Sequence, residues 1–313
     1  MNQTVISSLL PVVLLIALGL LVGKRGWIRD TSVKDLSNLV FLVLSPALLF
    51  HAMSTVRIEQ LSLRPVAAYF LGAFIIFGGT LLLKGFNRVS VVTAIANTYS
   101  NTAMIGIPLI GLAYGAPGMV TLLTLVSLHS LVLLSLATVA VELAQAREQA
   151  ISGQGAKRHI LAVLGLAVRN AIVHPVPIPI IVGLLWAQTG WRMPEVIDKP
   201  IQWLGQAFGP LALVMVGVTL AQTRIGTHFK GALALAVVKN LLHPALVVVI
   251  GWMLGLTGLP LTVMVVAAAL PMGANVFLFA QRYRANEDLI TAAVAVSTAT
   301  GILTLSLVMF WVG

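Results

Sequence analysis

Ten stretches of mostly apolar residues, each long enough to cross a membrane as a helix, follow one another along this chain of 313 residues. A bilayer core requires about 20 such residues per helical crossing. Because only 9% of the residues are charged and the mean hydropathy is +1.02, a soluble fold is excluded, and we predict an all-α polytopic membrane protein. The predicted spans cover residues 6–23, 36–53, 65–83, 89–112, 117–142, 160–187, 201–222, 231–254, 260–281 and 289–312.

The basic residues between these stretches are unevenly distributed, which predicts the orientation of the chain. The odd-numbered loops carry thirteen Lys and Arg residues, whereas the even-numbered loops carry four. Since positively charged loops stay in the cytoplasm, we expect the odd loops inside, both termini outside, and insertion in the plasma (inner) membrane. The scatter of these charges over short loops argues against a nucleic-acid partner, despite the net charge of +10.

A polar stretch at residues 145–158 divides the chain into two halves of five spans. We expect residues 1–144 to form a first five-helix repeat, residues 145–158 a cytoplasmic linker, and residues 159–313 a second repeat. Because five is an odd number, the second half enters the membrane in the opposite orientation, as in the inverted repeats of transporters. Prolines recur in spans 4 and 9, although prolines are common in any membrane helix.

Two polar segments interrupt the apolar residues of spans 4 and 9. Residues 97–110 read NTYSNTAMIGIPLI, and residues 269–275 read ALPMGAN. A proline removes a backbone donor and crowds the preceding turn, so we expect Pro108 and Pro271 to break the two helices. In a membrane such breaks are tolerated only where they face protein or a polar cavity. Paired broken helices in corresponding halves point to the substrate site of a transporter.

These two breaks predict an anion-binding site. The second half of each broken helix begins with unpaired backbone amides at the positive end of the helix dipole, where an anion binds readily. The alternative for the asparagines is that they only satisfy backbone groups freed by the prolines. The predicted substrate-binding residues are Asn97, Asn101, Thr102, Gly106, Pro108, Pro271, Gly273, Asn275 and Lys239.

Ionisable residues inside the spans form a second group of candidates. Lys239 lies in span 8, where a charge costs about 2.5–3.5 kcal/mol on insertion scales, so a functional role is the first hypothesis. It could bind a substrate carboxylate or stabilise the ends of broken helices, or its stem could reach toward the membrane surface. His129 and His243 are candidates for proton coupling, because imidazole titrates near neutral pH; the alternative is a neutral ring with one hydrogen bond.

The motifs around the two breaks resemble those of a known family. Residues 101–110, followed by Ala113-Tyr114-Gly115, and residues 270–283 (LPMGANVFLFAQRY) resemble the span-4 and span-9 signatures of the auxin efflux carrier family. That family includes plant auxin exporters and bacterial organic-acid permeases, and the similarity extends over all ten spans. Weaker matches occur at residues 44–51, 215–221 and 239–244.

The resemblance implies ten transmembrane helices in two inverted five-helix repeats, with broken helices 4 and 9 crossing near the midplane. Spans 1, 2, 6 and 7 would form a scaffold that carries a homodimer interface, and spans 3–5 and 8–10 would form a transport domain. The implied function is secondary transport of small organic anions, mono- or dicarboxylates, across the lipid bilayer by an elevator-like alternating-access movement. We expect no cofactor and no metal ion.

The chain departs from the plant exporters in three features: a short central loop, the lack of a charged pair in span 3, and His129 where those proteins carry glutamine. A small carboxylate of the bacterial type is therefore favoured over auxin. The alternatives are a sodium-coupled organic anion symporter similar to bile-acid symporters, and a channel, which would need a continuous polar stripe or charged rings. No enzyme is expected, because the sequence contains neither His-Glu-x-x-His nor Gly-x-Ser-x-Gly.

Overall fold

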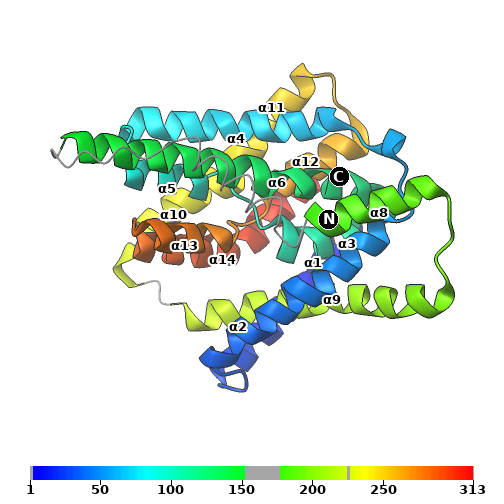
Figure 1. The fold of residues 1–313 in the computed structure, drawn as a ribbon. Helices are drawn as coiled ribbons and strands as arrows, with labels where there is room; N and C mark the ends of the chain where they lie inside the picture. Colours follow the sequence, from blue (N-terminus) through cyan, green and yellow to red (C-terminus); the bar gives the residue numbers. More distant parts are fainter. Residues whose placement is uncertain (1–2, 152–176, 224–225, 313) are drawn as a thin grey trace.

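The computed structural model describes residues 3–151, 177–223 and 226–312, and nearly all of these residues are helical (Figure 1). Seven helices in these ranges are long and apolar enough to cross a membrane, and two shorter apolar helices cover residues 178–189 and 258–269. The prediction of an all-α polytopic membrane protein is therefore confirmed. Both ends of the described chain lie toward the same end of the helix bundle.

The helices of the first part of the chain follow the predicted apolar stretches. They are α1 (Gln3–Lys24), α2 (Asp30–Leu39), a π-helical segment (Val40–Leu44), α3 (Ser45–Met53), a short 3₁₀ turn (Ile58–Gln60), α4 (Leu63–Lys84), α5 (Arg88–Ala96), a second π-helical segment (Thr102–Gly106) and α6 (Ile107–Ile151). α6 turns sharply at Gly115, whose φ of 59° favours glycine, so it contains two helices joined at a kink.

The far end of α6 differs from the prediction. The helix continues to Ile151, past the predicted end of span 5 at residue 142 and into the predicted linker. The added residues are mostly Ala, Glu, Gln and Arg, which have high helix propensity although most of them are polar. Hydropathy therefore located the membrane part of this helix but not its end. Residues 152–158 of the predicted linker, and most of the predicted span 160–187, lie outside the described residues.

The second part of the chain also contains interrupted helices. It contains α8 (Pro177–Thr189), α9 (Glu195–Gln222), a 3₁₀ turn (Gly226–His228), α10 (Phe229–Val237), a third π-helical segment (Val238–Leu242), α11 (His243–Met253), α12 (Gly258–Ala269), α13 (Asn275–Tyr283) and α14 (Glu287–Val312). α12 and α13 are separated by an irregular segment that contains Pro271.

Each π-helical segment is followed by a residue that precedes a proline. The proline ring crowds the carbonyl four residues before it, and the wider turn gives that carbonyl room. In each case the residue before the proline donates its amide to the carbonyl five residues earlier: Ser45 to Val40, Ile107 to Thr102, and His243 to Val238.

Pro108 therefore lies inside a helix that accommodates it, as the second residue of α6. The irregular residues of this span are 97–101, which precede the proline. The prediction that Pro108 breaks span 4 is wrong in this detail, because the wide turn absorbs the clash that would have ended the helix.

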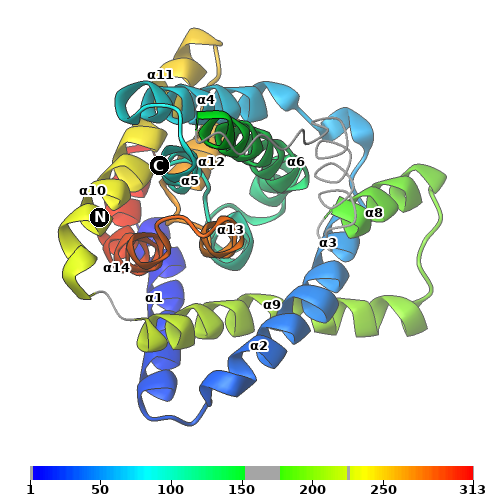
Figure 2. The same ribbon diagram turned by 60° about the vertical axis from the view of Figure 1, so that its left-hand side comes forward.

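The helices gather in two groups (Figure 2). α4–α6 and α10–α14 form a compact cluster, whereas α2, α3, α8 and α9 lie along one side of it, with α2 crossing α9. α1 packs along α9 at two glycines: a Cβ on Gly19 would overlap the Val214 carbonyl, and one on Gly217 would overlap the Ile16 carbonyl. Small residues at such positions let membrane helices approach closely, which fixes α1 to the second group.

Candidate functional site

The two irregular segments lie side by side inside the cluster. Each segment is extended for a few residues, and the two segments run antiparallel, with Ser100 opposite Met272. The Asn101 amide donates to the Pro271 carbonyl at 2.8 Å, and the Gly273 amide donates to the Tyr99 carbonyl at 2.9 Å. This short bridge satisfies backbone groups that the interrupted helices cannot satisfy themselves, as burial in an apolar interior requires.

Asn101 begins the second half of the first broken helix. Its side-chain oxygen accepts a hydrogen bond from the Met104 amide at 3.2 Å, and its carbonyl accepts one from the Gly106 amide at 3.1 Å. This is the arrangement of a helix N-cap. Asn101 is half-buried and Thr102 is buried, so the start of the π-helical segment Thr102–Gly106 directs its first amides toward the crossing.

Asn275 begins the second half of the other broken helix, α13. Its side chain is half-buried and donates from Nδ2 to the Tyr99 hydroxyl at 3.1 Å. The Tyr99 hydroxyl is in turn 2.6 Å from the Ser130 Oγ on α6. Through Tyr99, the second break is therefore tied both to the first break and to the helix that follows it.

The starts of both second half-helices line one small cavity of about 40 Å³. A volume of this size holds water rather than an organic molecule. Its lining residues are Phe41, Tyr99, Ser100, Asn101, Thr102, Ala103, Met104, Val126, Ser130, Gly273, Ala274 and Asn275. The predicted residues Asn101, Thr102, Gly273 and Asn275 are thus brought together around a single polar space.

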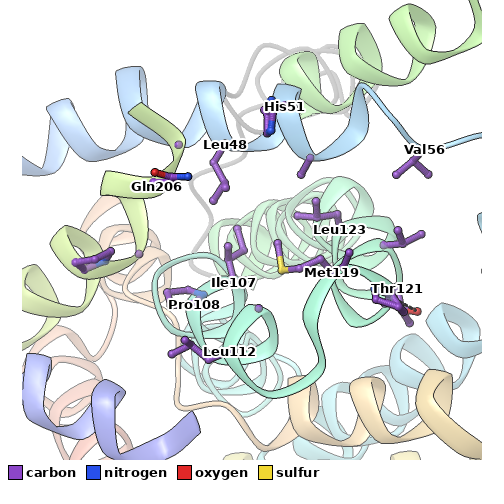
Figure 3. A pocket seen from close by; sticks show the side chains of 18 of the residues that line it. Leu48, His51, Val56, Ile107, Pro108, Leu112, Met119, Thr121, Leu123 and Gln206 are labelled. Atoms are coloured by element: carbon purple, nitrogen blue, oxygen red, sulfur yellow. Dashed lines mark hydrogen bonds between the residues drawn. The ribbon is translucent and has the colours of Figure 1, made fainter. Parts of the chain in front are cut away.

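A much larger cavity, of about 1130 Å³, continues along the same half-helix (Figure 3). It separates the first residues of α6 from α3 and α9, and most of its lining is apolar, including Ile107, Pro108 and Leu48. The polar residues on its wall include His51, whose Nδ1 is 3.1 Å from Asp198 Oδ1 on α9. Pro108, predicted as part of the binding site, therefore faces this second space rather than the small polar cavity.

Gly106 and Pro271 make close packing contacts at the crossing. A Cβ on Gly106 would come within 2.7 Å of the Leu270 Cδ1 atom, and a Cβ on Gly301 would come within 2.6 Å of the Pro271 Cγ atom. Neither Gly106 nor Pro271 lines the small cavity. A larger side chain at Gly106 would press on Leu270 of the second break, and one at Gly301 would press on Pro271 from α14.

Lys239 lies behind the crossing, fully buried. Its Nζ donates to the Ala268 carbonyl at 2.6 Å and to the Leu270 carbonyl at 2.9 Å, where α12 ends. Lys239 lines neither of the two cavities. Among the roles that the sequence left open, these hydrogen bonds match stabilisation of a broken helix end.

Asn97, His129 and His243 also lie behind the crossing. Asn97 is buried and donates from Nδ2 to the Thr80 Oγ1 at 3.2 Å on α4, so it faces away from the small cavity. His129 Nε2 is 2.9 Å from the Tyr69 hydroxyl. The ring of His243 packs against Tyr69 with centroids 4.8 Å apart, and neither of its nitrogens has a hydrogen bond of good geometry among the described residues.

Sequence reasoning missed several side chains that hold the crossing together. Ser297 on α14 accepts from the Met272 amide at 2.9 Å and donates to the Asn240 Oδ1 at 2.8 Å. Tyr69 on α4 donates to the Ser100 Oγ at 2.8 Å. In the sequence, Ser297 and Tyr69 are polar residues within apolar helices. Serine in such a position usually bonds to a carbonyl of its own helix, so nothing in the sequence indicated a contact with another helix.

An apolar all-α chain in which two broken helices pair at their interruptions has the architecture of a membrane transport protein. A family model described as "Membrane transport protein" matches residues 4–309. The chain therefore belongs to this family, the auxin efflux carrier family, and the resemblance seen in its motifs is confirmed. It is a transport protein and not an enzyme.

The relatives are of two kinds. "Auxin efflux carrier component 8" of Arabidopsis thaliana is 29% identical over 140 residues, 43% of this chain and 38% of the relative. "Auxin efflux carrier component 2" of Oryza sativa subsp. japonica is 31% identical over 132 residues, 40% of this chain and 21% of the relative. "Putative malonate transporter" of Rhizobium meliloti (strain 1021) is 28% identical over 293 residues, 89% of this chain and 86% of the relative. The matched region thus spans under half of these plant relatives but most of the bacterial one.

Proposed function

We propose that this protein is a secondary transporter that moves small organic anions, mono- or dicarboxylates, across the plasma membrane. The observation that carries this proposal is the pairing of two helix starts, with Asn101 and Asn275, around one small cavity. Amides at a helix start favour anions, and neutral side-chain donors hold an anion that must also be released. The similarity to the bacterial protein named for malonate, over 89% of this chain, supports a small carboxylate as the substrate.

In this proposal the anion contacts Asn101, Thr102, Gly273 and Asn275, which already line the small cavity. Because that cavity has a volume of only about 40 Å³, a carboxylate group of the anion occupies it in this proposal, and the rest of the anion requires a larger space. The cavity of about 1130 Å³ borders the same half-helix and offers that space. Its apolar wall suits the carbon skeleton of an organic acid, while the carboxylate reaches the amides at the crossing.

The movement we propose is elevator-like. α4–α6 and α10–α14 form the transport domain, and α1–α3, α8 and α9 form the scaffold, which also carries the homodimer interface. The apolar lining of the large cavity supports this division, because apolar surfaces can slide without breaking polar contacts. The hydrogen-bonded contact at its edge, between His51 and Asp198, joins two scaffold helices and does not cross to α6. We extend the proposal to ten spans in two inverted repeats, with both termini outside.

A thermal-shift screen of the purified protein tests this function. Binding to the folded state raises the melting temperature by mass action, so a panel of mono- and dicarboxylates that includes malonate should contain at least one stabilising anion. The stabilisation should be lost in Asn101→Ala and kept in Asn87→Ala, which removes a matched N-cap at the start of α5, away from the crossing. Repeating the screen with and without sodium distinguishes the sodium-coupled alternative. If no anion stabilises the wild-type protein, the proposal is rejected.

A further inference from the structure

The side-chain nitrogen of Lys239 is surrounded by hydrogen-bond acceptors. The two atoms within hydrogen-bond distance of its Nζ, the Ala268 and Leu270 carbonyl oxygens, are both acceptors, at 2.6 and 2.9 Å. Distances in this range are typical of charge-assisted hydrogen bonds. Both carbonyls lie at the end of α12, where the negative end of the helix dipole stabilises a cation.

No carboxylate balances this charge. The chain has no Asp or Glu between Asp198 and Glu287, a range that includes α10 to α13. No acidic side chain is found among the buried residues of the described ranges either. A buried cation without a counter-ion is costly, and helix carbonyls supply only a partial negative charge. An ammonium group at Lys239 would therefore leave the interior with an excess of positive charge.

This excess charge lies directly behind the crossing. The Leu270 carbonyl that binds Lys239 belongs to the residue before Pro271, and the Pro271 carbonyl accepts the Asn101 amide at 2.8 Å. Residues 270–273 connect the two places, because the Leu270 carbonyl accepts from Lys239 Nζ and Gly273 lines the small cavity. In an apolar interior, opposite charges at the two ends of such a segment attract more strongly than in water.

We propose that Lys239 is a fixed counter-charge for the transported anion, acting through the field at the crossing and not by contact. The inference rests on the proposed function. It specifies the substrate class, since one negative charge on the ligand cancels the charge of Lys239. A monoanion therefore makes the loaded crossing electrically neutral, and its passage along the apolar cavity moves no net charge. A dianion leaves one negative charge uncompensated during that movement.

Three substitutions separate the charge of Lys239 from its hydrogen bonds. Lys239→Gln keeps a hydrogen-bond donor and loses the charge, Lys239→Arg keeps the charge, and Lys239→Met loses both. In the Gln and Met variants we expect affinity to fall about tenfold for monomethyl malonate, a monoanion, and about a hundredfold for malonate, a dianion. Lys239→Arg should lose less than about threefold for either ligand. Lys230→Gln is the matched control, because it removes an exposed, screened charge near the start of α10.

Calorimetric titration of the purified variants, with their melting temperatures, gives the result. Two results would assign Lys239 a structural role and overturn the inference. One is an equal loss of affinity for both ligands in Lys239→Gln. The other is a smaller loss of affinity in Lys239→Gln than in Lys239→Arg. A wild-type protein that binds neither ligand would instead reject the proposed function itself. The two failures are therefore distinguishable.

A measurement on the wild-type protein covers the case in which the variants do not fold. Proteoliposomes with equal monomethyl malonate on both sides exchange labelled ligand only through the loaded state. Under a potassium–valinomycin potential of about 100 mV, moving one net charge changes its energy by about 2.3 kcal/mol, whereas a neutral complex is unaffected. We expect the exchange rate to change less than about twofold. A severalfold dependence on voltage would overturn the inference.

Discussion

The two breaks at the crossing have the same outline but are held in place differently. In the first, Asn101 caps the helix that follows it, and a π-helical turn accommodates Pro108 within the same segment. In the second, Lys239 binds the carbonyls that end α12, and Ser297 of α14 binds the Met272 amide. The helix after the first break is capped by its own asparagine, although Tyr69 of α4 also donates to Ser100. By contrast, the helix end and the Met272 amide of the second break are both held by side chains of other helices.

The two breaks also differ in how much of each can contact a ligand. Asn101 is half-buried and its segment opens toward both cavities, so the first break can meet a ligand directly. Residues 270–273 are as buried as residues 97–100, but only the helix that follows the first break continues along the large cavity. We infer that the first break carries most of the recognition and the second fixes its geometry.

The largest effect should come from removing an external support of the second break. Ser297→Ala leaves both the Met272 amide and the Asn240 side-chain oxygen without this partner in a buried place. We expect a loss of about 2–6 kcal/mol in unfolding free energy, from about 1–3 kcal/mol for each of the two unsatisfied groups. Denaturation of purified protein measures it, with Ser306→Ala as the control, because the Ser306 hydroxyl donates to the Ile302 carbonyl of its own helix. Equal stability of the two variants would contradict the proposed dependence on other helices.

The next effect concerns binding at the first break. Asn101→Ala removes one hydrogen bond to a charged ligand, which typically costs about 1.5–3 kcal/mol, so affinity should fall about tenfold to a hundredfold. Asn275→Ala should show a similar or smaller loss, since its amide already donates to Tyr99. Direct binding measurements on both variants, with melting temperatures, make the comparison. Wild-type affinity with lower stability in Asn101→Ala would mean that the asparagine serves only as a helix cap.

The two prolines sharpen the same comparison. Pro108→Ala restores an amide that can pair with the Met104 carbonyl, so the π-helical turn should tighten to an α-helix and shift the residues around Asn101. We expect a higher melting temperature together with weaker anion binding. Pro271→Ala lies in extended backbone and leaves a gap beside Gly301, so it should lower the melting temperature. Thermal unfolding of both variants checks these opposite signs, and a shift in the same direction for both would refute the distinction.

The smallest effect is expected at His129. Its one described hydrogen bond joins it to Tyr69, which in turn supports Ser100 in the first break, so we expect the imidazole to act there as a structural group. His129→Gln preserves a polar partner for Tyr69 and should leave the pH dependence of transport unchanged. Uptake assays between about pH 5 and 8 cover the range in which an unperturbed imidazole titrates. A flattened profile in an active variant would instead assign His129 to proton coupling.

The sequence by itself determined the class of protein, the positions of most of the described membrane helices and the existence of two breaks. These features follow from local properties: hydropathy sets the length of a span, and Asn, Gly and Pro in an apolar stretch mark an interruption. The family was recognisable for the same reason, because its motifs lie at the breaks. Asn101, Thr102, Gly273 and Asn275 could be named in advance, since each lies beside a helix start in the sequence itself.

Tertiary structure alone decided how the breaks are supported and which predicted residues face a cavity. Ser297 lies 25 positions from Met272 in the sequence, and no local pattern predicts that a serine hydroxyl meets that amide. Lys239 could have faced substrate, lipid surface or helix end, and only the packing of its helix against α12 placed its nitrogen at two carbonyls. A buried polar group must find a partner, but which partner it finds depends on how helices distant in sequence pack together.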